Sequence, residues 1–257
     1  MAATIFQISV FNCVVLCWFG VGLVTVVSLF FVTAPYGRYG RSGWGPMLDA
    51  RLGWVLMELP AVAIVAALFV TSGRGGDTVG LVFFLMWEIH YVQRTFIYPA
   101  LLPPGSSPMP LSIPLLATVF NLFNGYLQGG WLYRVGPVYD TAWLHGPRFI
   151  AGAALFFGGM AINLHADNVL RNLRKPGETG YKVPRGGFYR WVSCPNYLGE
   201  TVEWTGWAIA TWSPAGAAFA FWTAANLVPR AVAHHRWYRE KFPEYPNERK
   251  AVIPFVF

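Results

Sequence analysis

Seven long apolar stretches follow one another along this chain and constrain its fold more than any other feature. Their lengths lie around the roughly 20 residues that a helix needs to cross the hydrocarbon core of a bilayer. They cover residues 5–33, 52–72, 79–99, 111–133, 147–170, 197–212 and 215–233. Charged residues make up 12% of the chain, whereas a soluble domain carries about 25%. The sequence therefore predicts an all-α integral membrane protein with seven transmembrane helices in a single membrane-embedded domain, residues 1–257.

The basic residues predict how these helices are oriented. With the N-terminus outside and the C-terminus cytoplasmic, sixteen of the 19 lysines and arginines fall on the cytoplasmic side, as the positive-inside rule requires. Twelve of them lie in the fifth loop and the C-terminal tail. The net charge of +7 then reflects topology and contact with anionic lipids, and it predicts no nucleic-acid partner. The alternative is that these cations hold a polyanionic cofactor.

Cysteines and histidines give no metal site. The three cysteines, Cys13, Cys17 and Cys194, have neither a disulfide framework nor a ligand spacing. His234 and His235 are adjacent, so they diverge on a helix, and no H-E-x-x-H motif is present. We therefore expect no metal and no haem.

An ionisable residue at membrane depth is costly and is a functional candidate by default. Glu58 is the strongest candidate for a functional residue, because it lies in an apolar segment two residues before Pro60 and no cation is near it in the sequence. One interpretation is a structural carboxylate that caps the helix break at Pro60. The preferred interpretation is a protonated carboxyl group that donates a hydrogen bond.

The third stretch ends in a polar helical face. His90, Arg94 and Tyr98 recur every four residues, and Tyr91 points about 100° away from His90. Either tyrosine alone is compatible with the aromatic belt of a membrane interface. The polar surroundings of Tyr91 favour a functional role for it.

Three later segments carry similar polar faces. Asn163, Asp167 and Arg171 step by four, with Arg174 three residues further, which is compatible either with an internal Asp–Arg pair or with a site. A turn-rich loop with several cations follows over residues 175–187. The other two faces consist of Asn196, Glu200 and Glu203, and of Arg230, His234 and Tyr238. We expect a cofactor site that faces the cytoplasm and a deeper, apolar substrate cavity.

These motifs together resemble the steroid 5α-reductases. The resemblance covers about residues 35–257, with the motifs in the same order, and we expect a bacterial-type homologue. Its motifs are M-E-L-P, H-Y-x-x-R-T-F-x-Y-P, G-x-x-I-N-x-H-A-D, L-R-K-P-G-E-x-G-Y-x-x-P, N-Y-L-G-E-x-x-E-W and R-K-A-x-I-P-F-x-F. It implies NADPH-dependent reduction of the Δ4 double bond of a 3-oxo-Δ4 steroid, with hydride passing to steroid carbon 5. By motif match, Glu58 and Tyr91 are the expected catalytic residues, hydrogen-bonded to the 3-keto oxygen.

The same resemblance implies the residues that bind the cofactor. By motif match they are Asn163, Asp167, Arg174, Tyr181, Lys182, Asn196, Glu200, Arg230, His234 and Tyr238. Tyr98 and Arg171, from the polar faces above, complete the predicted set. Spans one to four would form mainly the substrate cavity, and spans five to seven with loop 171–195 mainly the cofactor site. The segment 99–107 departs from the family pattern, since it lacks the expected basic residues and asparagine, which leaves the choice of NADPH over NADH open.

Other functions remain open at this level. A reductase of enoyl or polyprenol lipids is a near alternative, and an isoprenylcysteine-type methyltransferase would share the C-terminal motifs. A seven-span transporter or receptor would explain the topology but not the motifs. We expect a monomer in a bacterial cytoplasmic membrane or the endoplasmic reticulum, surrounded by lipids, with a steroid substrate entering from the bilayer.

Overall fold

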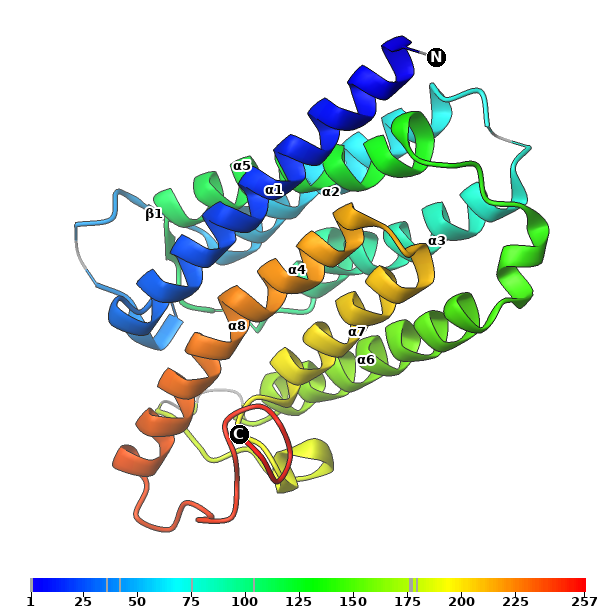
Figure 1. The fold of residues 1–257 in the computed structure, drawn as a ribbon. Helices are drawn as coiled ribbons and strands as arrows, with labels where there is room; N and C mark the ends of the chain where they lie inside the picture. The colour runs from blue at the N-terminus through cyan, green and yellow to red at the C-terminus, as the bar shows by residue number, and fades with distance from the viewer. Residues whose placement is uncertain are drawn as a thin grey trace. The chain divides into compact units, whose positions relative to one another are not determined.

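The computed structural model of the chain is helical over most of its length (Figure 1). It describes residues 2–35, 37–41, 43–74, 76–103, 105–175, 178 and 180–257, with side chains from residue 7 onward. The helices are Ala2–Phe31 (α1), Ala50–Val70 (α2), Thr78–Val92 (α3), Tyr98–Ala100 (α4), Ser112–Gly130 (α5), Pro147–Arg171 (α6), Pro195–Thr211 (α7) and Pro214–Lys241 (α8). The strands Met47–Leu48 (β1) and Met109–Pro110 (β2) pair antiparallel. Shorter helical turns cover Gly37–Tyr39, Gln93–Ile97, Trp131–Val135, Thr141–His145 and Gly187–Arg190.

Each of the seven predicted apolar stretches is helical. A π-helical turn over Gln93–Ile97 joins α3 to α4, and another over Trp131–Val135 extends α5. Among the described residues, three helices are long and apolar enough to cross a membrane, judged by length and composition: Gln7–Phe31, Ala50–Val70 and Pro147–Arg171. The structure is thus that of a mostly helical protein suited to a membrane, while seven spans and their orientation stay predictions.

The chain divides into two compact units. The first takes residues 1–17, 34–149 and 213–215, and the second takes residues 18–33, 150–212 and 216–257. The first unit therefore holds α2, α3 and α5, and the second holds α6, α7 and nearly all of α8.

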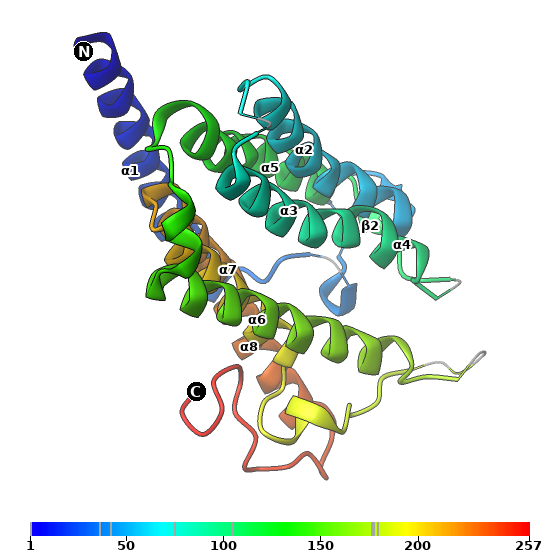
Figure 2. The same ribbon diagram turned by 90° about the vertical axis from the view of Figure 1, so that its right-hand side faces the viewer.

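In the first unit, α2 lies beside both α3 and α5 (Figures 1 and 2). The carboxylate of Asp49 caps the start of α2 by accepting from the amides of Arg51 and Leu52. Small residues let α5 approach α2 closely, since a Cβ added to Gly129 would lie 2.8 Å from Cδ1 of Leu68. This close packing allows short polar side chains of α5 to reach the α2 backbone.

In the second unit, four glycines let α6 and α7 touch backbone to backbone. They are Gly152 and Gly159 of α6 and Gly199 and Gly206 of α7. A Cβ on Gly159 would lie 2.3 Å from the amide nitrogen of Glu203, and one on Gly199 would lie 2.5 Å from that of Asn163. No side chain larger than hydrogen fits at such distances, so these glycines fix the spacing of the two helices.

The C-terminal segment returns to the start of α7, as Figure 1 shows in red beside yellow. Val192 and Lys250 form a parallel bridge, and the amides of Ser193 and Cys194 donate to the carbonyls of Lys250 and Ala251 at 2.9 and 3.2 Å. The predicted turn between the last two helices is also present, since Trp212 adopts the left-handed conformation with φ 45° before α8 starts at Pro214.

Candidate functional site

Glu58 lies half-buried on α2, where three polar contacts from α5 converge. Asn121 donates from Nδ2 to Oε2 of Glu58 at 3.0 Å and to the carbonyl oxygen of Met57 at 2.6 Å. Pro60 has no amide hydrogen, so the carbonyl of Leu56 loses its helical partner. The hydroxyl of Thr118 donates to that carbonyl at 3.1 Å. The hydroxyl of Thr118 thus replaces the hydrogen bond that Pro60 removes from the carbonyl of Leu56, and the carboxyl group of Glu58 is not needed for this.

Tyr91 lies at the level of Glu58 on the neighbouring helix. The indole of Trp87 donates to the carbonyl of Ala61 at 3.0 Å, and the rings of Trp54 and Tyr98 lie 4.9 Å apart. These two contacts show that α2 and α3 run antiparallel. Glu58 precedes Ala61 by one turn on α2, and Tyr91 follows Trp87 by one turn on α3. Glu58 and Tyr91 therefore lie at the same height along the two helices. Tyr91 is 3% exposed, and its ring packs on that of Trp87 at 4.5 Å.

Tyr98 was predicted to bind cofactor, and it belongs to an aromatic cage in the first unit. The guanidinium carbon of Arg94 lies 4.7 Å from the ring centre of Trp54 and 4.5 Å from that of Tyr98. Arg94 sits on the π-helical turn Gln93–Ile97, and such turns are frequent at functional sites. The remaining predicted cofactor residues all lie in the second unit.

Asn163, Asp167 and Asn196, predicted from two separate motifs, meet at the contact between α6 and α7. Asn163 is 4% exposed and donates from Nδ2 to the carbonyl oxygen of Asn196 at 3.0 Å. The amide of Asn196 donates to Oδ1 of Asp167 at 3.4 Å. Arg171 donates from Nη2 to Oδ1 of Asn168 on its own helix at 3.0 Å.

Arg230 and His234 of α8 meet through Tyr197 of α7. Arg230 donates from Nη2 to the hydroxyl oxygen of Tyr197 at 3.0 Å and also lies over its ring, 5.2 Å from the centre. The same hydroxyl lies 3.3 Å from Nε2 of His234. Arg230 can only donate, so the hydroxyl oxygen of Tyr197 accepts from it, and the direction of the contact with His234 depends on the tautomer of the histidine. Tyr197 was part of a quoted motif but was not predicted as a site residue.

A second group that the sequence did not reveal surrounds Ser193. Its Oγ lies 2.6 Å from Nδ1 of His235, 2.6 Å from the hydroxyl of Tyr245 and 3.1 Å from the carbonyl oxygen of Lys250. A carbonyl only accepts, so Ser193 donates to Lys250, and His235 and Tyr245 donate to Ser193. With all three contacts made, Nδ1 of His235 is a hydrogen-bond donor. Burial, followed by the charges of Arg239 and Lys250, lowers the pKa of His235.

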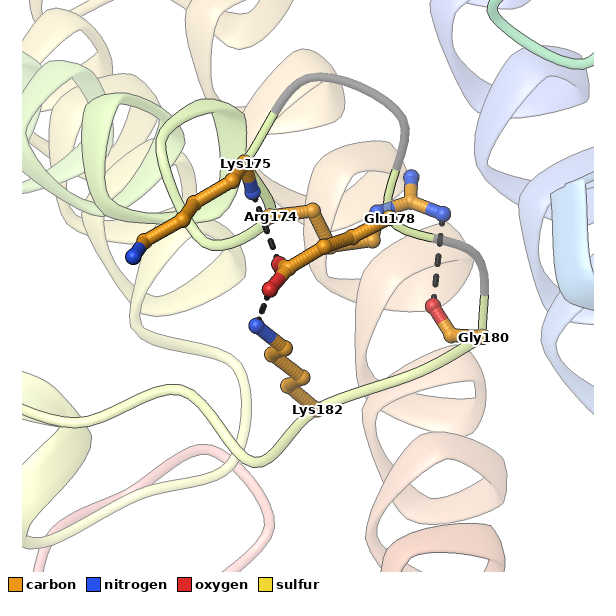
Figure 3. A network of polar contacts seen from close by, with 5 residues as sticks. All are labelled: Arg174, Lys175, Glu178, Gly180 and Lys182. Carbon is orange, nitrogen blue, oxygen red and sulfur yellow. Dashed lines mark hydrogen bonds and ion pairs between the residues drawn. The ribbon is translucent and has the colours of Figure 1, made fainter.

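The loop after α6 folds on itself through its own charges (Figure 3). Arg174 donates to the carbonyl oxygen of Gly180 at 3.3 Å, and Glu178 accepts from the side chain of Lys182 and the amide of Lys175. The bond from Lys182, and then that from Lys175, lower the pKa of Glu178. Pro176, Gly177 and Thr179 of this predicted turn-rich loop lie outside the described residues.

The other predicted cofactor residues lie around these groups. The ring of Tyr181 contacts that of Trp237 edge-on at 4.9 Å, which brings the loop to α8. Tyr238 is buried and stacks on Tyr245 at 5.3 Å with nearly parallel planes. Glu200 lies half-buried on α7, one turn after Asn196. The second unit thus gathers amides, carboxylates, arginines and tyrosines from three helices.

These features define a class: a helical protein suited to a membrane, with polar groups enclosed among apolar helices in each of its units. Comparison with known proteins gives the family. A model of the 3-oxo-5-alpha-steroid 4-dehydrogenase family matches residues 107–257. The chain is 48% identical to 3-oxo-5-alpha-steroid 4-dehydrogenase 1 of Bos taurus, over 91% of this chain and 92% of that one. It is 42% identical to a steroid 5-alpha-reductase of Gossypium hirsutum, over 97% and 98% of the two chains.

A relative from Homo sapiens, 3-oxo-5-alpha-steroid 4-dehydrogenase 1, is 45% identical over 86% of each chain. The chain therefore belongs to the steroid 5-alpha-reductase family, as its motifs predicted, and the names of its relatives describe oxidoreductases.

Proposed function

We propose that this protein reduces the Δ4 double bond of 3-oxo-Δ4 steroids, with NADPH as the reductant, to 5α-3-oxosteroids. Relatives that match it nearly end to end carry the names of this activity. The observation that carries the proposal is the common level of Glu58 and Tyr91 on the neighbouring helices α2 and α3.

Glu58 and Tyr91 act on the 3-keto oxygen. Addition of hydride at carbon 5 moves the electrons of the double bond toward that oxygen, so an enolate develops there. Two neutral O–H groups that donate to the oxygen stabilise its growing charge, and they do so most in the transition state. Protonation at carbon 4 completes the addition of one hydride and one proton.

The second unit is the proposed cofactor site. Asn163, Asp167 and Asn196 offer amide and carboxylate groups for ribose hydroxyls and the carboxamide. Arg174 and Arg230 suit phosphates, because guanidinium groups form charge-assisted bonds with them. When the loop binds the cofactor, the contacts that Arg174, Glu178 and Lys182 make within the loop must break and be replaced by contacts with the cofactor. When bound, the reduced nicotinamide supplies the hydride.

We further propose that all seven long helices cross the bilayer, with the N-terminus outside and the basic fifth loop and tail in the cytoplasm. Spans one to four then serve the steroid and spans five to seven the cofactor. The protein works as a monomer, since the polar groups named above come from one chain. The steroid enters from the lipid.

The test uses purified protein in lipid nanodiscs, NADPH and a 3-oxo-Δ4 steroid such as testosterone. We expect NADPH consumption that depends on steroid and equals the 5α-product formed. Glu58→Gln should lower kcat about 100-fold and leave NADPH affinity unchanged, since it weakens a donor to the enolate. A Glu58→Gln variant at full rate would remove Glu58 from the mechanism. Reduction of an enoyl thioester or a polyprenol, but no steroid, would contradict the proposed substrate.

A further inference from the structure

Asn121 is nearly fully buried, 4% exposed, at the interface of α5 with α2. Its amide nitrogen bridges two successive residues of α2, the carbonyl oxygen of Met57 at 2.6 Å and Oε2 of Glu58 at 3.0 Å. A backbone carbonyl accepts but never donates. The atom facing Met57 must therefore be the NH2 nitrogen, and this fixes the orientation of the whole amide.

The fixed amide determines which oxygen of Glu58 can donate. Its second N–H points at Oε2, and in the protonated form proposed for Glu58 the oxygen that accepts this bond is the carbonyl-type oxygen, since the hydroxyl oxygen is the weaker acceptor. The acid proton is then carried by the other oxygen, Oε1. Without the amide, the two oxygens would be equivalent and the carboxyl group could rotate about its terminal bond, whose rotamers are broad.

Two neighbouring contacts of α5 with α2 involve no atom of Glu58. Thr118, one turn earlier on α5, donates to the carbonyl of Leu56, which Pro60 leaves without a helical partner. Gly125, one turn later, lies against α2, since an added Cβ would be in ordinary contact, 3.4 Å from Cβ of Ile64. The short side chain of Asn121 is thus held between two closely packed helices.

We infer that Asn121 is a positioning residue for the reaction: it orients the carboxyl group of Glu58 so that Oε1 carries the proton donated to the 3-keto oxygen. This rests on the proposed role of Glu58. Positioning matters because a displacement of about 1 Å of a catalytic group can cost about 100-fold in rate.

The test compares Asn121→Leu, which keeps the size of the side chain but has no N–H, with Thr118→Val at the same interface. Thr118→Val also loses a hydrogen bond to α2, but that bond does not touch Glu58. We expect Asn121→Leu to lower kcat by about 10- to 100-fold, with NADPH affinity unchanged and a smaller effect on KM. Thr118→Val should keep kcat. Asn121→Ala serves as a second variant if leucine prevents folding.

A double variant tests whether Asn121 acts through Glu58. If it does, Glu58→Ala with Asn121→Leu is no slower than Glu58→Ala alone, because alanine leaves no polar group for Asn121 to orient. If Asn121→Leu slows both backgrounds by the same factor, the inference is overturned.

Infrared spectroscopy gives a readout that does not need turnover. The carbonyl stretch of protonated Glu58 is identified as the band that Glu58→Gln removes, and loss of the Asn121 donor should move it to higher frequency. An unmoved band overturns the inference. A wild-type protein that does not reduce steroids, or a Glu58→Gln variant at full rate, would instead refute the proposed function.

Discussion

Replacing Gly159 by alanine should separate α6 from α7, whereas the same change at its neighbour Gly158 should not. A Cβ on Gly159 would lie 2.3 Å from the amide nitrogen and 2.8 Å from Cα of Glu203, and 2.5 Å from the carbonyl oxygen of Gly199. These are backbone atoms, so no side chain can rotate to make room. A Cβ on Gly158 meets nothing within 4 Å.

The magnitude follows from that geometry. Ordinary contact begins near 3.4 Å, so the helices must move apart by about 1 Å. Overpacking of this kind costs about 1–3 kcal/mol, and a clash with backbone belongs at the upper end. Both variants gain the same roughly 0.5–1 kcal/mol from alanine in a helix, so the difference between them isolates the clash. We expect about 3 kcal/mol, or roughly 6–12 °C in midpoint for a chain of this size.

The assay is thermal unfolding of both variants in the same detergent, followed by NADPH affinity. Gly159→Ala should unfold at lower temperature and bind NADPH more weakly, because Asn163 and Asn196 meet one turn from the clash. Gly158→Ala should match or exceed the wild type in both. Equal midpoints for the two variants would refute the close packing of α6 on α7.

Three further outcomes follow from the second unit. Arg174→Ala should weaken NADPH binding about 10- to 100-fold without changing steroid affinity, and an unchanged NADPH dissociation constant would count against its phosphate role. Tyr197→Phe should weaken NADPH binding about two- to tenfold, because Arg230 loses its acceptor; full affinity would show the hydroxyl to be dispensable. The lowered pKa of His235 means that the unfolded chain binds a proton at this histidine before the folded chain does, as pH falls below the ordinary value of 6.5. The contribution of neutral His235 to stability is therefore fully present above that pH and decreases below it. His235→Asn should reduce this loss between about pH 7 and 5 in thermal unfolding, and an unaltered pH dependence would contradict it.

The sequence predicted the helices well, because burial in lipid demands long apolar runs and little else produces them. The last apolar stretch ends at residue 233, but the predicted polar face of Arg230, His234 and Tyr238 extends the helix beyond it, and α8 continues to Lys241. Hydropathy marks where a helix leaves an apolar medium, and a polar helix can continue beyond it. The basic residues Arg239 and Lys241 in the last turn favour this extension.

Local spacing predicts part of the candidate site. A four-residue spacing places side chains on one face of one helix, and it put Arg230 and His234 on a common face. Their connection through Tyr197 joins residues 33 and 37 positions apart, and the orientation of Glu58 by Asn121 joins residues 63 apart. Such contacts depend on how helices pack, which no local pattern encodes. Asn121 did have a signal, as an amide within an apolar stretch at membrane depth.

The central claim is that Glu58 and Tyr91 hold an enone while the cofactor reduces it at carbon 5. Its most direct test is a single turnover with NADPH deuterated at the transferred position of nicotinamide carbon 4 and a 3-oxo-Δ4 steroid. The account predicts a 5α-product with one deuterium, at steroid carbon 5, and label transfer about 100-fold slower in Glu58→Gln with the cofactor still bound. Deuterium at another carbon, or a reduced steroid without the label, would contradict it.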